Sequence, residues 1–197
     1  MTYRSAIINA DTLARATDAC CVLDSSLQFL YCNCAWDDFA RANGGTRAAM
    51  GEALLHKRLL TYIPDILKSF YAHQFNILRQ RGTVWYHRYE CPSPREFAVY
   101  ELQALLMHDQ NEILICHSQI VRRPHTRPAV EPRGSTRNGG RPVSMCCHCR
   151  RTFRDDGSGA WDWIPAYVQN PPANYIACLC QPCTDYYQHG GDLVLNS

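Results

Sequence analysis

Two CxxC pairs near the end of the chain have the spacing best suited to chemistry. Cys146 and Cys149 form one pair, and Cys180 and Cys183 form the other. Two intervening residues let one turn present both sulfur atoms to an ion at ~2.3 Å, and a second such turn completes a tetrahedral set. The sequence therefore predicts a structural zinc site with no open position for chemistry. Its predicted ligands are Cys146, Cys149, Cys180 and Cys183.

Three neighbouring residues leave this assignment open to a shift of one or two positions. They are Cys147, His148 and Cys178. Covalent haem attachment is a poor alternative, because it requires a histidine directly after CxxC, where Arg150 and Thr184 stand. A thiol switch stays open as an alternative, because zinc thiolates can be oxidised with loss of the metal.

The segment between the two pairs is short. It predicts a small hairpin turning at 156–159 and a short helix at 164–168. A module of this size cannot bury a sufficient core. We therefore expect zinc binding to supply most of its folding free energy, on the order of 10 kcal/mol.

Overall composition sets the broad class of protein. The chain has 197 residues, twelve cysteines and a formal net charge of +2, so there is no general electrostatic reason to expect nucleic acid or an anionic membrane as partner. The sequence offers neither a secretory h-region nor an apolar membrane span. We expect a cytoplasmic protein, and a reducing compartment favours metal binding by paired cysteines over disulfides.

Composition changes after Val121, where the chain becomes rich in Arg, Pro and Gly. This predicts a linker over 124–144. Glu131 is the only acidic residue in the segment 122–144 to balance its arginines. These are Arg122, Arg123, Arg127, Arg133, Arg137 and Arg141. A solvated tether is the favoured interpretation, and contact with phosphate or an acidic partner is the alternative.

The part before the linker alternates between strand and helix signals. Strands are predicted at 19–24, 27–33, 82–91, 95–109 and 111–121, and helices at 34–45 and 64–80. The order of two strands, helices and three strands predicts an α+β fold. Its helices would cover one face of a five-stranded antiparallel sheet.

These elements resemble a PAS domain over residues 19–123. The residues that carry the resemblance are Asp24, Asn33, Trp36 and Phe39 in the opening segment. A second run, Tyr89, Cys91, Ser93 and Pro94, resembles a subset of PAS domains from bacterial signalling proteins. The resemblance implies ligand sensing or dimerisation without a reaction, and the fold cannot name the ligand.

The C-terminal segment is similar to a cysteine module that follows PAS or receiver domains in some bacterial signalling proteins. The matching residues are Arg150, Arg151, Asp155, Asp156, Gly157, Trp161, Tyr167, Cys180 and Cys183. The extra residues Cys147, His148 and Cys178 depart from that pattern.

One histidine lies on the predicted apolar stripe of the long helix, which comprises Ile66, Phe70, His73 and Ile77. Haem-binding PAS domains carry an axial histidine on a comparable helical face, so the resemblance makes His73 a candidate haem ligand. The favoured interpretation is a hydrogen-bonded core histidine, or one pointing to solvent from a helix with a different phase. Haem or another small ligand in the PAS pocket stays unassigned.

The predicted organisation is a helical cap over 1–18, a PAS domain over 19–123, a linker over 124–144 and a zinc module over 145–190. Ile7, Ile8 and Leu13 could pack as a dimerisation helix. No Ser, His and acid set stands in a catalytic context, so we expect no enzyme.

We expect a bacterial signal-transduction sensor or adaptor that forms a homodimer, contacts a signalling protein and does not bind membranes. The alternative is a zinc-dependent nucleic-acid-binding adaptor that uses the arginine-rich linker. The charge balance of the zinc module does not favour this alternative. Asp155, Asp156, Asp162 and Asp185 offset Arg150, Arg151 and Arg154.

Overall fold

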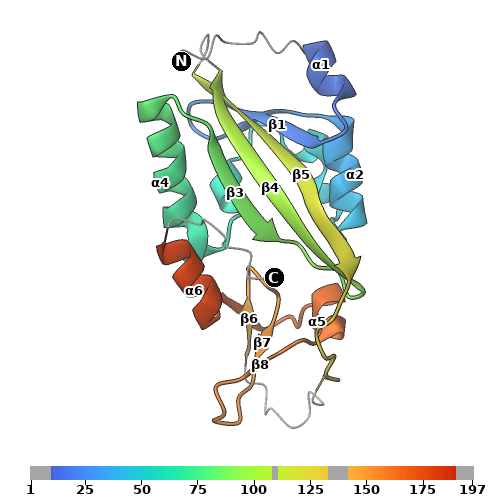
Figure 1. Ribbon diagram of the computed structural model, residues 1–197. Coiled ribbons are helices and arrows are strands. Elements are labelled where there is room, and N and C mark those ends of the chain that lie inside the picture. Colours follow the sequence, from blue (N-terminus) through green and yellow to red (C-terminus); the bar gives the residue numbers. More distant parts are fainter. Residues whose placement is uncertain (1–9, 108–110, 133–141, 190–197) are drawn as a thin grey trace. The chain divides into compact units, whose positions relative to one another are not determined.

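The computed structural model describes residues 10–107, 111–132 and 142–189. The chain divides into two compact units (Figure 1). The first unit comprises Met1–Ile63, Leu67–His87 and Glu101–Gln119. The second comprises Pro64–Ile66, Arg88–Tyr100 and Ile120–Ser197.

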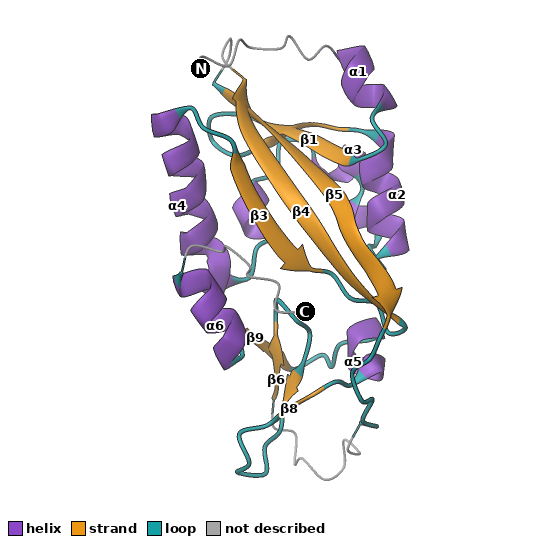
Figure 2. Ribbon diagram, in the orientation of Figure 1, coloured by secondary structure: helices purple, strands orange, loops and turns teal. Residues whose placement is uncertain are grey.

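A five-stranded sheet is the main β structure (Figure 2). Its strands are β1 (Ala19–Leu23), β2 (Phe29–Cys32), β3 (Trp85–Glu90), β4 (Glu96–Met107) and β5 (Glu112–Pro124). The strand order is β2-β1-β5-β4-β3, and β1 is antiparallel to both of its neighbours. The predicted α+β class with a five-stranded antiparallel sheet is confirmed.

The helices of this part precede the sheet or connect β2 to β3. They are α1 (Ala10–Arg15), α2 (Cys34–Ala42), α3 (Gly51–Leu54) and α4 (Asp65–Arg81), with short 3-10 turns at Arg47–Ala49 and Leu59–Thr61. Asn33 begins α2 as its N-cap, because its side-chain oxygen accepts a hydrogen bond from the Trp36 amide at 3.0 Å. The order of two strands, helices and three strands is the one that the PAS resemblance predicts.

Helix α4 buries a different stripe from the predicted one. Its buried residues are Leu67, Tyr71, Phe75 and Leu78. Ile66 is 49% exposed and His73 is also exposed. The predicted stripe through Ile66, Phe70, His73 and Ile77 is therefore wrong in phase, because α4 carries apolar residues on two adjacent faces and the larger buried set lies one position further on.

Helices and strands of the first unit share an aromatic core. Phe75 of α4 is fully buried, and its ring meets that of Trp85 edge to face at 5.2 Å between centroids. Phe29 of β2 is 1% exposed and packs edge to face on Trp36. Burying one such side chain contributes roughly 2–3 kcal/mol, so these contacts fix α2 and α4 against the sheet.

The second unit contains a smaller sheet, of order β8-β7-β6-β9. Its elements are β6 (Val143–Cys146), β7 (Thr152–Phe153), β8 (Trp161–Asp162), α5 (Pro165–Gln169), β9 (Tyr175–Cys178) and α6 (Gln181–Gln188). The antiparallel pair β7 and β8 and helix α5 confirm the predicted hairpin and short helix. The parallel pairing of β6 with β9 and helix α6 were not predicted from the sequence.

Part of the predicted linker is structured within the second unit. The Val130 amide donates to the Trp163 carbonyl at 2.9 Å, and Ala129 forms a bridge with Trp163. Residues 125–130 therefore form a strap that is hydrogen-bonded to the unit, which differs from the solvated tether expected there. Residues 133–141 lie outside the described ranges.

Among the described helices, none is long and apolar enough to cross a membrane. The predicted dimerisation residues Ile7 and Ile8 lie outside the described residues, whereas Leu13 is buried on α1.

Candidate metal centre

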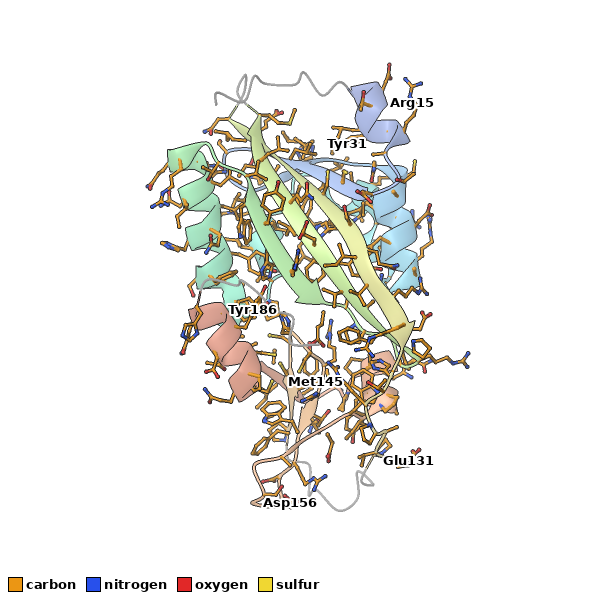
Figure 3. The ribbon with its side chains drawn as sticks, viewed as in Figure 1. Arg15, Tyr31, Glu131, Met145, Asp156 and Tyr186 are labelled. Atoms are coloured by element: carbon orange, nitrogen blue, oxygen red, sulfur yellow. The ribbon has the colours of Figure 1, made fainter. Side chains whose placement is uncertain are left out.

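The first CxxC pair lies in the turn that joins β6 to β7. Cys146 ends β6 directly after Met145, which is labelled in Figure 3. The turn is closed by two backbone hydrogen bonds, from the Arg150 amide to the Cys146 carbonyl at 3.0 Å and from the Cys146 amide to the Arg151 carbonyl at 2.8 Å. Arg150 adopts φ of 62°, in the left-handed region. This tight turn directs Cys146 and Cys149 toward one point.

The second CxxC pair lies at the start of α6. Cys180 is the N-cap residue, and Cys183 lies in the first turn, where the Thr184 amide donates to the Cys180 carbonyl at 2.9 Å. The N-terminus of a helix carries partial positive charge, which favours thiolates over thiols. Pro182 suits this position because the first turn needs no donor there.

The four sulfur atoms of Cys146, Cys149, Cys180 and Cys183 lie within 4.8 Å of one another, and all four residues are buried. The Cys149 and Cys180 sulfurs are 3.7 Å apart. Tetrahedral zinc with ~2.3 Å bonds to sulfur requires sulfur atoms about 3.8 Å apart. The four cysteines predicted from spacing are therefore brought together in a set that fits this ion.

Charge within the cluster also favours a cation. Hydrogen bonds from the other thiols, that of Cys149 foremost, lower the pKa of Cys146. Hydrogen bonds with the same neighbours, that of Cys146 foremost, raise the pKa of Cys183. Four thiolates so close together would repel strongly without a positive ion between them. The donor set is thus suited to a divalent, thiophilic metal.

Apolar side chains enclose the sulfurs. Trp161 and Leu179 are partly buried and pack against the four cysteines. Such side chains would limit the access of water to an ion held by these sulfurs.

Arg127 is a second-unit residue next to the cluster, and the sequence identified it only as one of the linker arginines. Its guanidinium donates to the Cys149 carbonyl at 3.1 Å and to the Glu90 carboxylate at 2.7 Å. The same group lies over the Phe97 ring at 5.2 Å and over the Trp163 ring at 5.4 Å. Its side chain is only 15% exposed. These contacts hold the first cysteine turn from outside the metal-ligand set.

The three residues that left the ligand assignment open lie beside the cluster and outside it. The Cys147 amide donates to the Cys178 carbonyl at 2.9 Å. Burial raises the pKa of Cys147 to about 12 and that of Cys178 to about 11. His148 Nδ1 lies 3.0 Å from the Tyr187 hydroxyl.

Two histidines of the first unit, His73 and His87, lie in environments that the sequence did not predict. His73 is exposed on α4, so it does not face the core, and this placement gives the haem hypothesis no support. His87 is 1% exposed and stacks on Trp85 at 5.6 Å between centroids, with Phe70 also nearby. Alternation along β3 was the signal that could have placed His87 inside.

Comparison with known proteins supplies fold neighbours only. No protein-family model matches the sequence, and no curated protein matches it significantly. Among solved structures, a PAS domain from a two-component sensor histidine kinase is 23% identical, with a TM-score of 0.36 over 54% of this chain and 88% of that one. A domain of a sensory box sensor histidine kinase/response regulator from Geobacter sulfurreducens is 21% identical, with a TM-score of 0.38 over 54% and 87%.

The photoactive yellow protein domain of the sensor histidine kinase Ppr from Rhodospirillum centenum is 11% identical, with a TM-score of 0.39 over 56% of this chain and 92% of that one. With TM-scores below 0.5, these similarities assign no function. The element order described above is itself PAS-like. The chain therefore combines a PAS-like fold with a C-terminal cluster of four cysteines that could hold a metal.

Proposed function

We propose that this chain is a signal-transduction sensor or adaptor. In this proposal the PAS-like part senses a small ligand or a redox state and dimerises, and a structural zinc module contacts a signalling partner. The observation that carries it is the set of four buried sulfurs within 4.8 Å of one another in a chain with a PAS-like sheet. In this arrangement the PAS-like part recognises the signal, and the metal-folded module recognises the protein partner.

We further propose that the zinc ion is structural and catalyses no reaction. Four cysteine ligands fill the tetrahedral positions of zinc, whereas catalytic zinc sites keep one position for water or substrate. Because all four cysteines are buried, a substrate would also have no direct approach to the ion. The metal then acts by folding the module and presenting its surface.

The nucleic-acid alternative is less well supported because several arginines are engaged within the second unit. Arg127 pairs with Glu90, Arg122 with Glu96, and Arg154 with Asp162. Such pairs leave less positive charge to neutralise phosphates. A filter-binding assay over a salt series tests this directly. Tight binding that weakens steeply with salt would favour the nucleic-acid adaptor over the signalling proposal.

The central experiment is native mass spectrometry of the purified protein with elemental analysis and an absorption spectrum. We expect one zinc ion per chain, and its loss on substitution of Cys183 by serine. Replacing the exposed Cys34 by serine is the matched control and should leave the zinc content unchanged. A folded protein with no bound metal would contradict the zinc module. The spectrum reports haem or flavin in the same sample.

Dimerisation is tested by sedimentation velocity at several protein concentrations. We expect a dimer whose population rises with concentration by mass action. A protein that stays monomeric at every concentration would contradict the proposed dimerisation.

A further inference from the structure

Two cysteines outside the metal centre lie opposite each other in the five-stranded sheet. Cys20 of β1 pairs with Cys116 of β5 in the antiparallel register. Their side chains therefore leave the same face of the sheet. Cys20 is 2% exposed, and Cys116 is half-buried. Both belong to an apolar cluster with Leu13, Val22 and Leu114.

The backbone shows which kind of cross-strand pair this is. The Cys20 carbonyl accepts from the Asn33 amide at 3.1 Å, and the Cys20 amide donates to the Asn33 side chain at 3.0 Å. Both backbone groups of Cys20 therefore point away from β5, so Cys20 and Cys116 form a non-hydrogen-bonded pair. The Cα atoms of such pairs are about 4.5 Å apart. Disulfides span Cα separations of ~4.4–6.8 Å, so a bond between these sulfurs needs little backbone movement.

The pairing of the two thiols also affects their pKa values. A hydrogen bond between the thiols lowers the pKa of Cys20 and raises that of Cys116. The thiolate is the nucleophilic form of cysteine. Cys20 is therefore suited to attack an oxidant as the thiolate. Cys116 is suited to attack the oxidised Cys20 and form the disulfide.

A second cross-strand pair provides an internal comparison. Cys21 of β1 lies opposite Cys32 of β2, also in a non-hydrogen-bonded position, but on the other face of the sheet. Burial raises the pKa of Cys21 and raises that of Cys32 to about 12. This pair has similar backbone geometry but no thiol that ionises readily, so the two pairs should differ in reactivity.

We propose that Cys20 and Cys116 form a redox-active dithiol, which a small hydroperoxide converts into a cross-strand disulfide. The pair lies beneath Leu13 of α1, which is 7% exposed. A small oxidant is therefore required, whereas a bulky disulfide reagent would be hindered.

The reaction balances with hydrogen peroxide as the oxidant. The Cys20 thiolate attacks one peroxide oxygen, the O–O bond breaks, and hydroxide leaves and takes a proton to become water. The resulting sulfenic acid is attacked by the sulfur of Cys116, which loses its proton. The S–S bond forms, the S–O bond breaks, and a second water leaves. Two thiols are oxidised by two electrons, and the peroxide is reduced to two waters.

The position of the pair gives this oxidation a structural consequence. Leu13 packs directly on the cluster that contains Cys20. Bond formation draws the two sulfurs to about 2.05 Å, which changes the surface on which α1 rests. The inference deepens the sensory role proposed above and rests on that role for its link to signalling. The chemistry of the pair does not depend on it.

The experiment treats the full-length protein with hydrogen peroxide, blocks free thiols with a maleimide, digests it with trypsin without reduction and analyses the peptides by mass spectrometry. Cys20 falls in peptide 16–41 and Cys116 in peptide 96–122. We expect a cross-linked species of these two peptides that has lost two hydrogens and disappears after reduction. Zinc content is measured in the same samples.

Variants assign the bond, because peptide 16–41 also contains Cys21, Cys32 and Cys34. C20S and C116S should reduce the cross-link to background, whereas C21S and C32S should retain it at the wild-type level. If C20S does not fold, C20A serves in its place. Failure to form the cross-link in wild type, or its persistence in a folded Cys20 variant, overturns the inference.

The same samples separate this inference from the proposed function. A disulfide in a protein that never contains zinc contradicts the zinc module and leaves the dithiol intact. Zinc present in full, with no disulfide at any peroxide concentration, contradicts the dithiol alone.

Discussion

Asn33 shows how one side chain can join three segments of the first unit. It is 2% exposed, and its oxygen accepts from the Cys20 and Trp36 amides, both at 3.0 Å. Its amide nitrogen donates to the Asp18 carbonyl at 2.9 Å and to the Leu13 carbonyl at 3.2 Å. The residue thereby ties the end of α1, strand β1 and the start of α2 together. The PAS resemblance pointed to this asparagine, but its links to α1 are visible only in the structure.

Replacing Asn33 by alanine should lower the free energy of unfolding by about 2–4 kcal/mol. The change removes a helix N-cap, which contributes ~1 kcal/mol, and leaves buried backbone groups without partners at a cost of ~1–3 kcal/mol. Urea unfolding followed by circular dichroism measures the effect. Asn43→Ala is the control, because Asn43 is an exposed cap of the same helix. Equal effects of the two substitutions would contradict this role for Asn33.

His117 should make the stability of the first unit depend on pH. Burial lowers its pKa to about 4 from an ordinary value of 6.5, and its ring lies 5.8 Å from that of Trp36 and is stacked on that of Phe39. The unfolded chain therefore binds a proton below about pH 6.5 that the folded protein does not bind until about pH 4. The stabilisation is fully present above pH 6.5 and falls as pH decreases.

The expected loss between pH 6.5 and pH 4 is about 1–2 kcal/mol, because His117 is only partly buried. Urea unfolding at a series of pH values should show this slope, and His117→Gln should flatten it. Exposed His73 replaced by glutamine is the control and should leave the slope unchanged. A wild-type slope that persists in His117→Gln would assign the pH dependence to other groups.

At the scale of elements, the strap at 125–130 contacts the rest of the second unit although it forms no helix or strand of its own. It contributes Arg127, which binds both the Cys149 carbonyl and Glu90, and it pairs with Trp163 through Ala129. The strap has almost no large apolar residues, so it resembles a linker in composition. What orders it is a set of contacts with residues distant in the sequence.

Replacing Arg127 by alanine should destabilise the second unit by about 1–3 kcal/mol, because it leaves a poorly exposed carboxylate and a backbone carbonyl without their donor. Arg122→Ala is the matched control. The Arg122 side chain is 56% exposed in its pair with Glu96, and such surface pairs contribute ~0–1 kcal/mol. Thermal unfolding of the zinc-loaded variants measures both, and an equal effect would show that Arg127 does not hold the turn.

Prediction from sequence succeeded where the signal was local. The spacing of the two CxxC pairs singled out the four cysteines that the structure brings together, and the strand signals in 95–109 and 111–121 located β4 and β5. Prediction failed for features that depend on contacts between residues distant in the sequence. The face of α4 was misplaced because Ile66 and Phe70 compete with Leu67 and Tyr71, and only packing against the sheet selects between them. The parallel pairing of Cys146 with Cys178 likewise has no sequence period to reveal it.

At the scale of the whole molecule, the two compact units differ in what stabilises them. The first has a core of large apolar side chains such as Phe29, Phe75 and Ile113. In the second, the four cysteines themselves form a buried cluster. A bound metal would supply much of the folding free energy of a small module of this kind.

Zinc removal should therefore selectively unfold the cysteine module, residues 142–189 of the second unit. After treatment with a strong chelator at neutral pH, we expect loss of the near-ultraviolet circular dichroism from Trp161 and Trp163, with the β-sheet signal of the first unit retained. Adding zinc back should restore the signal. Calcium should not, because four thiolates do not suit a cation that prefers oxygen ligands. An unchanged spectrum after complete metal removal would show that the module folds without zinc.

The left-handed conformation of Arg150 carries a further consequence. A non-glycine residue pays ~1–2 kcal/mol for that backbone geometry, and glycine would adopt it freely. An arginine there places a permanent cation one residue after Cys149, beside a zinc–thiolate complex whose own charge would be negative. If the four cysteines hold zinc, this cation would partly offset the negative charge of the complex. Arg150→Gly should then relieve the backbone strain of the turn and remove that positive charge.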